Sequence, residues 1–106
     1  MDITTIDTPQ KLGKALKNEF AKLGIEIKTR YIKTVRGLEG SWYEISTFRT
    51  GHIIPNELRK EFVSLNYGKP FEELNVNNPN DISYGNIQSQ RASLHGSQWK
   101  KWLESR

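Results

Sequence analysis

The stretch IEIKTRYIKTVR, residues 25–36, decides the fold of this chain of 106 residues. Its odd positions are mostly apolar, and three of its six even positions are cationic. Side chains of a β-strand point alternately to its two faces, so a period of two predicts a half-buried strand. One face is expected to pack on a core, while the other carries Lys28, Arg30 and Arg36 into solvent.

A second strand is predicted directly after this one. Residues 37–40, Gly-Leu-Glu-Gly, are typical of a hairpin connection, and residues 41–50 are rich in aromatic and β-branched residues. Both faces of the second strand carry apolar groups, so the pattern leaves open which face turns to the core. Arg49 lies on this strand and is expected to extend the basic face. Residues 52–54 are a candidate for a short third strand.

Two helices flank the predicted strands. Thr8 is a candidate N-cap of the first helix, Pro9 suits its first position, and Gly24 ends it. The second helix opens at residues 55–56 and closes at Gly68. Apolar side chains recur at helical spacing in both, which predicts one buried stripe on each helix.

The C-terminal part follows a loop rich in Pro and Asn. A helix is predicted from Asp81 or Ser83 to about Leu94, and Gly96 is expected to interrupt it. Residues 97–104 are expected to form a last short helix that carries two tryptophans.

These elements predict an α+β domain with two layers. A small antiparallel sheet of two or three strands packs against two helices, in the order α-β-β-(β)-α. The core domain is expected at residues 8–68. Residues 69–106 are expected to form a loop and helical extension, packed on the core or appended to it. The sheet face opposite the helices is expected to meet water.

Composition excludes several classes of protein. The formal net charge is +4, and positive charge is concentrated in residues 25–54 and 85–106. There is no cysteine, which excludes disulfides, thiolate zinc sites and a cysteine nucleophile. No apolar run approaches the roughly 18–20 residues of a membrane span, and no signal peptide is recognisable at the start. We therefore expect a cytoplasmic protein without a membrane partner.

The basic row predicts a surface that follows a phosphate backbone. Residues on one face of a strand repeat every 6.6–6.8 Å or so, which is close to the phosphate spacing of one nucleic-acid strand. The candidate binding residues are Lys28, Arg30, Arg36 and Arg49, with Trp99, Lys100 and Lys101 as a second patch for stacking and phosphate contacts. The alternative interpretations are an ordinary solvated strand face and a C-terminal tryptophan pair docked on the domain.

Nothing in the sequence predicts catalysis or a cofactor. His52 and His95 are too few for a metal site without further ligands, and no phosphate-binding glycine motif is present. A catalytic His52 would need a nearby carboxylate, and no spacing supplies one. The prediction is therefore a non-enzymatic protein with no metal and no cofactor.

The layout over residues 9–69 resembles the HicA-type toxins, small ribonucleases whose fold is similar to double-stranded-RNA-binding domains. The similarity lies in the helix, the basic strand, the turn ending Gly40-Ser41 and the pair Leu58-Arg59 on the second helix. That family places its catalytic His directly after Gly-Ser, where this chain has Trp42. The resemblance therefore implies an RNA-binding or partner-binding relative that lacks the nuclease activity. The pattern is also similar to small accessory domains of phages and plasmids.

Two hypotheses follow from the sequence. The first is a nucleic-acid-binding protein that uses the basic sheet face for RNA or DNA, with an affinity that falls steeply with salt. The second is a protein-binding adaptor or inhibitor encoded by a mobile element, which would use an exposed strand edge and the C-terminal aromatic segment.

Overall fold

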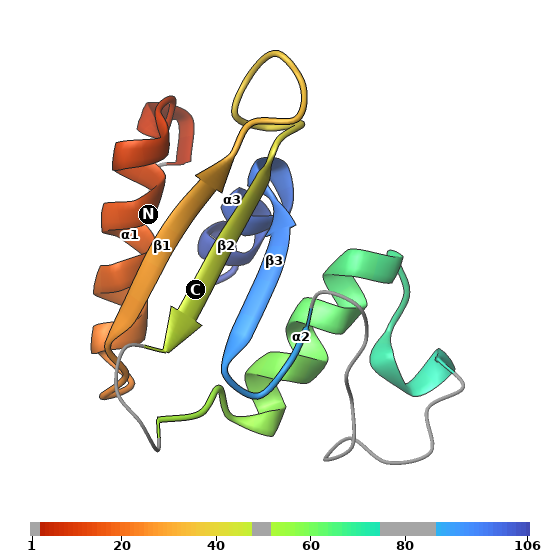
Figure 1. The fold of residues 1–106 in the computed structure, drawn as a ribbon. Coiled ribbons are helices and arrows are strands. Elements are labelled where there is room, and N and C mark those ends of the chain that lie inside the picture. The colour runs from red at the N-terminus through yellow and green to blue at the C-terminus, as the bar shows by residue number, and fades with distance from the viewer. Residues whose placement is uncertain (1–2, 48–51, 75–86) are drawn as a thin grey trace.

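The computed structural model of the chain describes residues 3–47, 52–74 and 87–106. It is an α+β fold with a three-stranded antiparallel sheet in the order β1-β2-β3 (Figure 1). The predicted class and the small antiparallel sheet are therefore confirmed. In chain order the elements are η1 (Ile3–Thr5), α1 (Pro9–Ala21), β1 (Ile27–Ile32), β2 (Trp42–Thr47), α2 (Asn56–Tyr67), η2 (Phe71–Glu73), β3 (Arg91–His95) and α3 (Gly96–Glu104).

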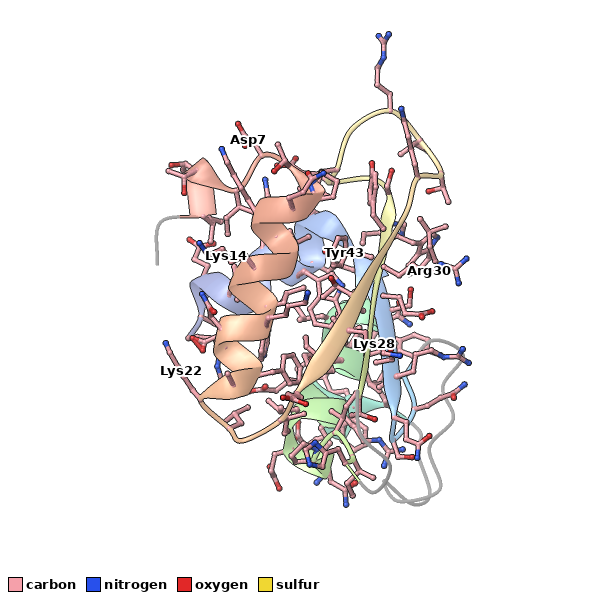
Figure 2. The ribbon with its side chains drawn as sticks, turned by 60° about the vertical axis from the view of Figure 1, so that its left-hand side comes forward. Asp7, Lys14, Lys22, Lys28, Arg30 and Tyr43 are labelled. Atoms are coloured by element: carbon pink, nitrogen blue, oxygen red, sulfur yellow. The ribbon has the colours of Figure 1, made fainter. Side chains whose placement is uncertain are left out.

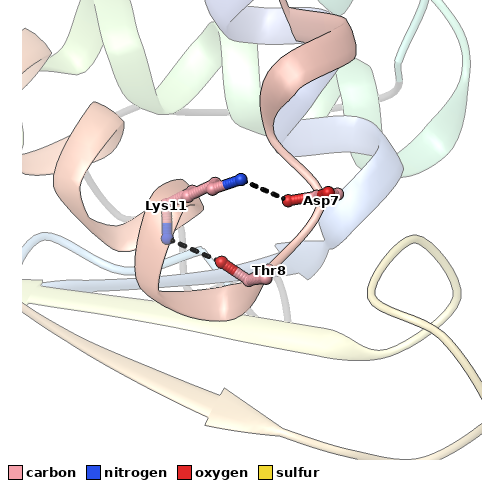
Figure 3. A network of polar contacts seen from close by, with 3 residues as sticks. All are labelled: Asp7, Thr8 and Lys11. Carbon is pink, nitrogen blue, oxygen red and sulfur yellow. Dashed lines mark hydrogen bonds and ion pairs between the residues drawn. The ribbon is translucent and has the colours of Figure 1, made fainter.

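The signals that start and stop the first two helices act as predicted. The Thr8 side chain accepts a hydrogen bond of 3.2 Å from the backbone N–H of Lys11, and Pro9 occupies the first position of α1 (Figure 3). Gly24 follows this helix with a φ of 77°, and Gly68 ends α2 with a φ of 70°. Both angles lie in the left-handed region, where glycine has no steric penalty.

The strands β1 and β2 are shorter than predicted, because their pairing ends where Ile32 faces Trp42. The connecting loop then runs through residues 33–41, so the strand predicted over residues 25–36 is wrong at its end. Ser41 explains this loop: it is fully buried, and its Oγ lies 3.0 Å from the carbonyl oxygens of Val35 and Gly37. The hydrogen bonds of this one hydroxyl thus hold the backbone of the loop against Ser41, so the chain leaves the direction of the strand.

The third strand lies elsewhere in the sequence than predicted. Residues 52–54 are not a strand; Ile54 is fully buried, and its N–H donates to the carbonyl of Ser89 at 2.6 Å. The place beside β2 is taken by β3, over residues predicted to end a helix. In β3 the buried Ala92 and Leu94 alternate with more exposed neighbours, which is strand periodicity.

The register of the sheet assigns each side chain to one of its two faces. One face packs against the helices and contributes to the core, and on β2 it includes Tyr43 and Ile45, which are 3% and 0% exposed. The other face, the open face, carries side chains that are exposed or half-buried. The structure thus settles the orientation of β2 that the pattern left open, with Trp42 on the open face.

All three α-helices meet in an aromatic cluster formed by Phe20, Phe62, Trp99 and Trp102. Ring centroids of Phe62 and Trp99 are 5.0 Å apart, and those of Phe20 and Trp102 are 5.4 Å apart. The cluster joins residues from both sides of the predicted boundary at residue 68 in one core. Such edge-on and tilted ring pairs add stability beyond the apolar area that they bury.

The predicted C-terminal helix is confirmed, and it begins at Gly96 rather than after it. The hairpin loop holds this start: the N–H groups of Gly96 and Ser97 donate to the carbonyls of Ser41 and Glu39, at 3.0 and 3.1 Å. A Cβ at Gly96 would collide with the carbonyl oxygen of Leu38. Gly96 is therefore required for close packing of the helix on the loop.

Candidate nucleic-acid interface

The open face is a small grid of nine side chains on three strands. Because the strands are antiparallel and in register, residues far apart in sequence lie in the same row. The three rows are Lys28, Ser46 and Arg91; Arg30, Glu44 and Ser93; and Ile32, Trp42 and His95.

Three exposed cations, Lys28, Arg30 and Arg91, share this face. In Figure 2, Lys28 and Arg30 point away from α1, on the opposite side of β1. Along β1 their Cα atoms are separated by about 6.6–6.8 Å, and Lys28 and Arg91 lie two strand spacings, about 10 Å, apart. The cations therefore form a compact triangle rather than a long row.

Glu44 is the carboxylate within the grid, and it lies directly opposite Arg30 in the β1–β2 pairing. Nevertheless, Arg30 and Arg91 form no ion pair with any carboxylate in the described part of the chain. Cationic groups outnumber carboxylates in the grid. The two guanidinium groups of the grid, those of Arg30 and Arg91, remain available to an external anion. Guanidinium binds phosphate through two parallel hydrogen bonds.

An aromatic pair completes the grid beside the cations. The rings of Trp42 and His95 are stacked, with centroids 3.9 Å apart and planes inclined by 27°. His95 Nδ1 lies 3.0 Å from the carbonyl oxygen of Gly40. Because a carbonyl oxygen only accepts, Nδ1 donates in this bond, and it holds the imidazole in place. Both side chains are half-buried, so the pair presents a fixed aromatic surface to solvent.

Of the predicted strand cations, Arg36 does not join this face. Arg36 lies in the loop of residues 33–41, beyond the last paired residues of β1 and β2. The expectation that it stands on the strand face is wrong, because the buried Ser41 bends the chain before that point. Arg49 lies outside the described residues.

The predicted second patch is dispersed over three surroundings. Trp99 is fully buried, and its Nε1 donates to the carbonyl of Tyr43, so its ring cannot stack on a base. Lys100 binds Glu39 of the hairpin loop at 3.1 Å. Lys101 is exposed at a groove between α2 and α3. The prediction that these three residues act together is wrong, because helical spacing places Trp99 on the inner side of α3.

Sequence reasoning missed Arg91 and His95 as members of the candidate site. The alternation in Arg-Ala-Ser-Leu-His, residues 91–95, is a strand signal that was available in the sequence. The strand that pairs with this segment could not be identified from the sequence, because the pairing of β2 with β3 depends on contacts between segments that are distant in sequence. Without that pairing, nothing places Arg91 and His95 beside Lys28 and Trp42.

In the part of the chain that the structure describes, the remaining candidate residues form no metal centre. Among the described residues, no three His, Asp or Glu side chains come together as metal ligands. His52 is half-buried, and its Nδ1 has no hydrogen-bond partner among the described residues. In the same part of the chain, no helix has the length and apolar character needed to span a bilayer.

Comparisons with protein-family models, with curated proteins and with solved structures give no match. The resemblance to the HicA-type toxins therefore stays a prediction based on the residue pattern. The arguments about function that follow depend on the geometry and charge of this chain alone.

Proposed function

We propose that this protein is a cytoplasmic, non-enzymatic domain of two layers that binds nucleic acid on the open face of its sheet. The observation that carries the proposal is that Lys28, Arg30 and Arg91 share the open face with the stacked pair of Trp42 and His95. Cations bind the phosphate backbone, and aromatic rings offer a stacking surface to unpaired bases.

The geometry favours a single strand of RNA or DNA over a duplex. The three cations form a triangle with sides of about 7–12 Å, a span of two or three phosphates along one strand. The Trp42–His95 pair lies one row beyond Arg30, where a base can reach it only if it is not paired.

Neutralising two of the cations tests the proposal. The double variant Lys28→Gln with Arg30→Gln should weaken binding of a twelve-nucleotide single strand, and lower the slope of log Kd against log salt concentration by about two. The matched control, Lys11→Gln with Lys22→Gln, removes the same charge from lysines that face Asp7 and Glu19. Fluorescence anisotropy at several salt concentrations measures both. Equal weakening in the two variants would show that only net charge matters.

Arg91→Gln extends this test to the strand that the sequence did not predict. Because Arg91 lies in one row with Lys28, its loss should reduce affinity and lower the salt slope by about one. The thermal unfolding midpoint should stay unchanged, since Arg91 is exposed.

A second candidate function, a protein-binding adaptor or inhibitor, is favoured by the position of β1 at the end of the sheet. A strand at that position can pair with an extended segment of another protein. In that case a nuclease-treated lysate would still yield one defined partner, and the glutamine variants of the open face would bind it normally.

A further inference from the structure

Besides the groove between α2 and α3, a second groove lies along α1, beside Thr29. The side chain of Thr29 lies on the face of the sheet opposite Lys28 and Arg30. This second groove is open and has a volume of about 480 Å³. One stripe of α1 from Gln10 to Asn18 forms its wall, and Thr29 and Tyr43 of the sheet contribute from below. The groove is large enough for a small polar ligand or one nucleotide.

The side chains around this groove have one sign of charge. The described residues that line it include Lys14, Lys17, Gln10 and Asn18, but no carboxylate. The larger groove between α2, η2 and α3, of about 830 Å³, differs because three glutamates and three lysines line it together. A hollow with cationic groups alone concentrates positive potential, whereas mixed charges cancel.

Along α1 and its C-cap, the lysines of this groove differ from the other two in having no acidic partner among the described residues. Lys11 binds Asp7 at 2.8 Å (Figure 3), and Lys22 binds a glutamate of α1 at 3.0 Å. Lys14 and Lys17 form no ion pair within the described residues. They are three positions apart on a helix, so they project side by side, and Figure 2 shows Lys14 on the exposed side of α1.

The floor of the groove is neutral and hydrogen-bonded. The Tyr43 hydroxyl donates to the carbonyl of Pro9 at 3.0 Å and is also hydrogen-bonded to Thr29. Burial raises the pKa of Tyr43 above its ordinary 10.0, so the phenol stays protonated at physiological pH. A Cβ at Gly13 would collide with this hydroxyl, so the glycine lets the helix approach the sheet so closely.

We propose that the groove along α1 binds a phosphate group. Lys14 and Lys17 supply the charge, and the amides of Gln10 and Asn18 supply neutral donors at its two ends. The phosphate comes either from the backbone of a bound nucleic acid, which rests on the proposed function, or from a small phosphorylated molecule, which does not.

Amide chemical shifts of the isotope-labelled protein test the site directly. Inorganic phosphate, adenosine monophosphate and the twelve-nucleotide strand are titrated separately, with chloride at equal ionic strength as reference. Shifts concentrated in residues 10–18 for at least one phosphate probe are expected. Shifts spread over all exposed lysines, or the same shifts with chloride, would overturn the proposal. Saturation with the monophosphate alone identifies a small-molecule site, and saturation with the oligonucleotide alone identifies a backbone phosphate.

Two variants connect these shifts to the groove. The double variant Lys14→Gln with Lys17→Gln should lower the affinity for the phosphate probe about tenfold. The control Lys11→Gln with Lys22→Gln should change that affinity less than about twofold. Gln10→Glu adds a carboxylate at the wall without steric change, and a negative charge in the first turn of a helix favours folding. This variant should therefore preserve or raise the unfolding temperature while it lowers the affinity for phosphate. Unchanged affinity in both groove variants would exclude the site.

The two proposals fail separately. If the open-face variants bind the oligonucleotide as tightly as the wild type but the groove variants do not, the sheet function is wrong and the groove stands. If only the open-face variants lose affinity and no phosphate probe shifts residues 10–18, the groove is wrong and the sheet function stands.

Discussion

Two tryptophans from the same protein, Trp42 and Trp99, have opposite surroundings. Trp42 stands half-buried on the open face and stacks on His95. Trp99 is fully buried, and its indole nitrogen donates to the carbonyl of Tyr43, the residue next to Trp42. The strand β2 thus carries one tryptophan on its open face and holds the other inside through a backbone carbonyl.

The comparison teaches that the neighbours of an aromatic residue in sequence do not determine its exposure. Trp99 is followed by two lysines, a composition typical of nucleic-acid contacts, yet it belongs to the core. Trp42 follows Gly-Ser in a stretch without a basic neighbour, yet it shares the open face with Arg30 and Lys28. Four changes test this difference.

The largest effect is expected from Trp99→Ala. It removes a buried ring from the aromatic cluster and leaves the Tyr43 carbonyl without its donor, so the free energy of unfolding should fall by about 3–5 kcal/mol. Many domains of this size have only 5–15 kcal/mol in total, so the variant should be near its limit of folding. Urea unfolding followed by circular dichroism measures the loss. A loss under about 1 kcal/mol would place Trp99 at the surface.

A smaller but sign-specific effect is expected from Gly96→Ala, which tests how α3 holds Trp99 in place. Alanine normally stabilises a helix relative to glycine. Here its Cβ would collide with the Leu38 carbonyl oxygen, so a loss of about 1–3 kcal/mol is expected. Thermal unfolding would contradict the close packing of helix and loop if the variant melted above the wild type.

Trp42→Ala should separate binding from stability. The stacked pair contributes about 0.5–1.5 kcal/mol to the free energy of unfolding, whereas loss of a base-stacking ring weakens single-strand binding by about 1–3 kcal/mol. Trp42→Phe, which retains a ring, is the control and should recover part of the affinity. Anisotropy and melting on the same samples compare the two quantities. Full affinity in the alanine variant would remove Trp42 from the interface.

The smallest effect is expected from Lys100→Gln. The side chain lies over the hairpin loop, where its ammonium binds the exposed Glu39. Surface ion pairs of this kind contribute about 0–1 kcal/mol, so stability should change little. Binding should change less than in Lys28→Gln, because Lys100 is outside the open face. If the two variants lost affinity equally, Lys100 would belong to the interface, and the interface would extend to the hairpin loop.

Elements with local signals were predictable from the sequence. Thr8, Pro9, Gly24 and Gly68 mark helix ends through their own backbone preferences, and the alternation around Lys28 and Arg30 marks a strand face. Arg36 could not be placed in the same way, because the hydrogen bonds of the buried Ser41 curve the loop away from the strand direction.

The sequence by itself determined where α1 and α2 begin and end, the positions of the first two strands, and the shared face of Lys28 and Arg30, since these depend on residues within a few positions of one another. Only the tertiary structure decided which face of β2 is buried, which segment forms the third strand, and that Arg91 and His95 join the candidate site. The physical reason is that strand pairing and burial are contacts between distant segments, and the free energy of those contacts outweighs the local preference of any one segment.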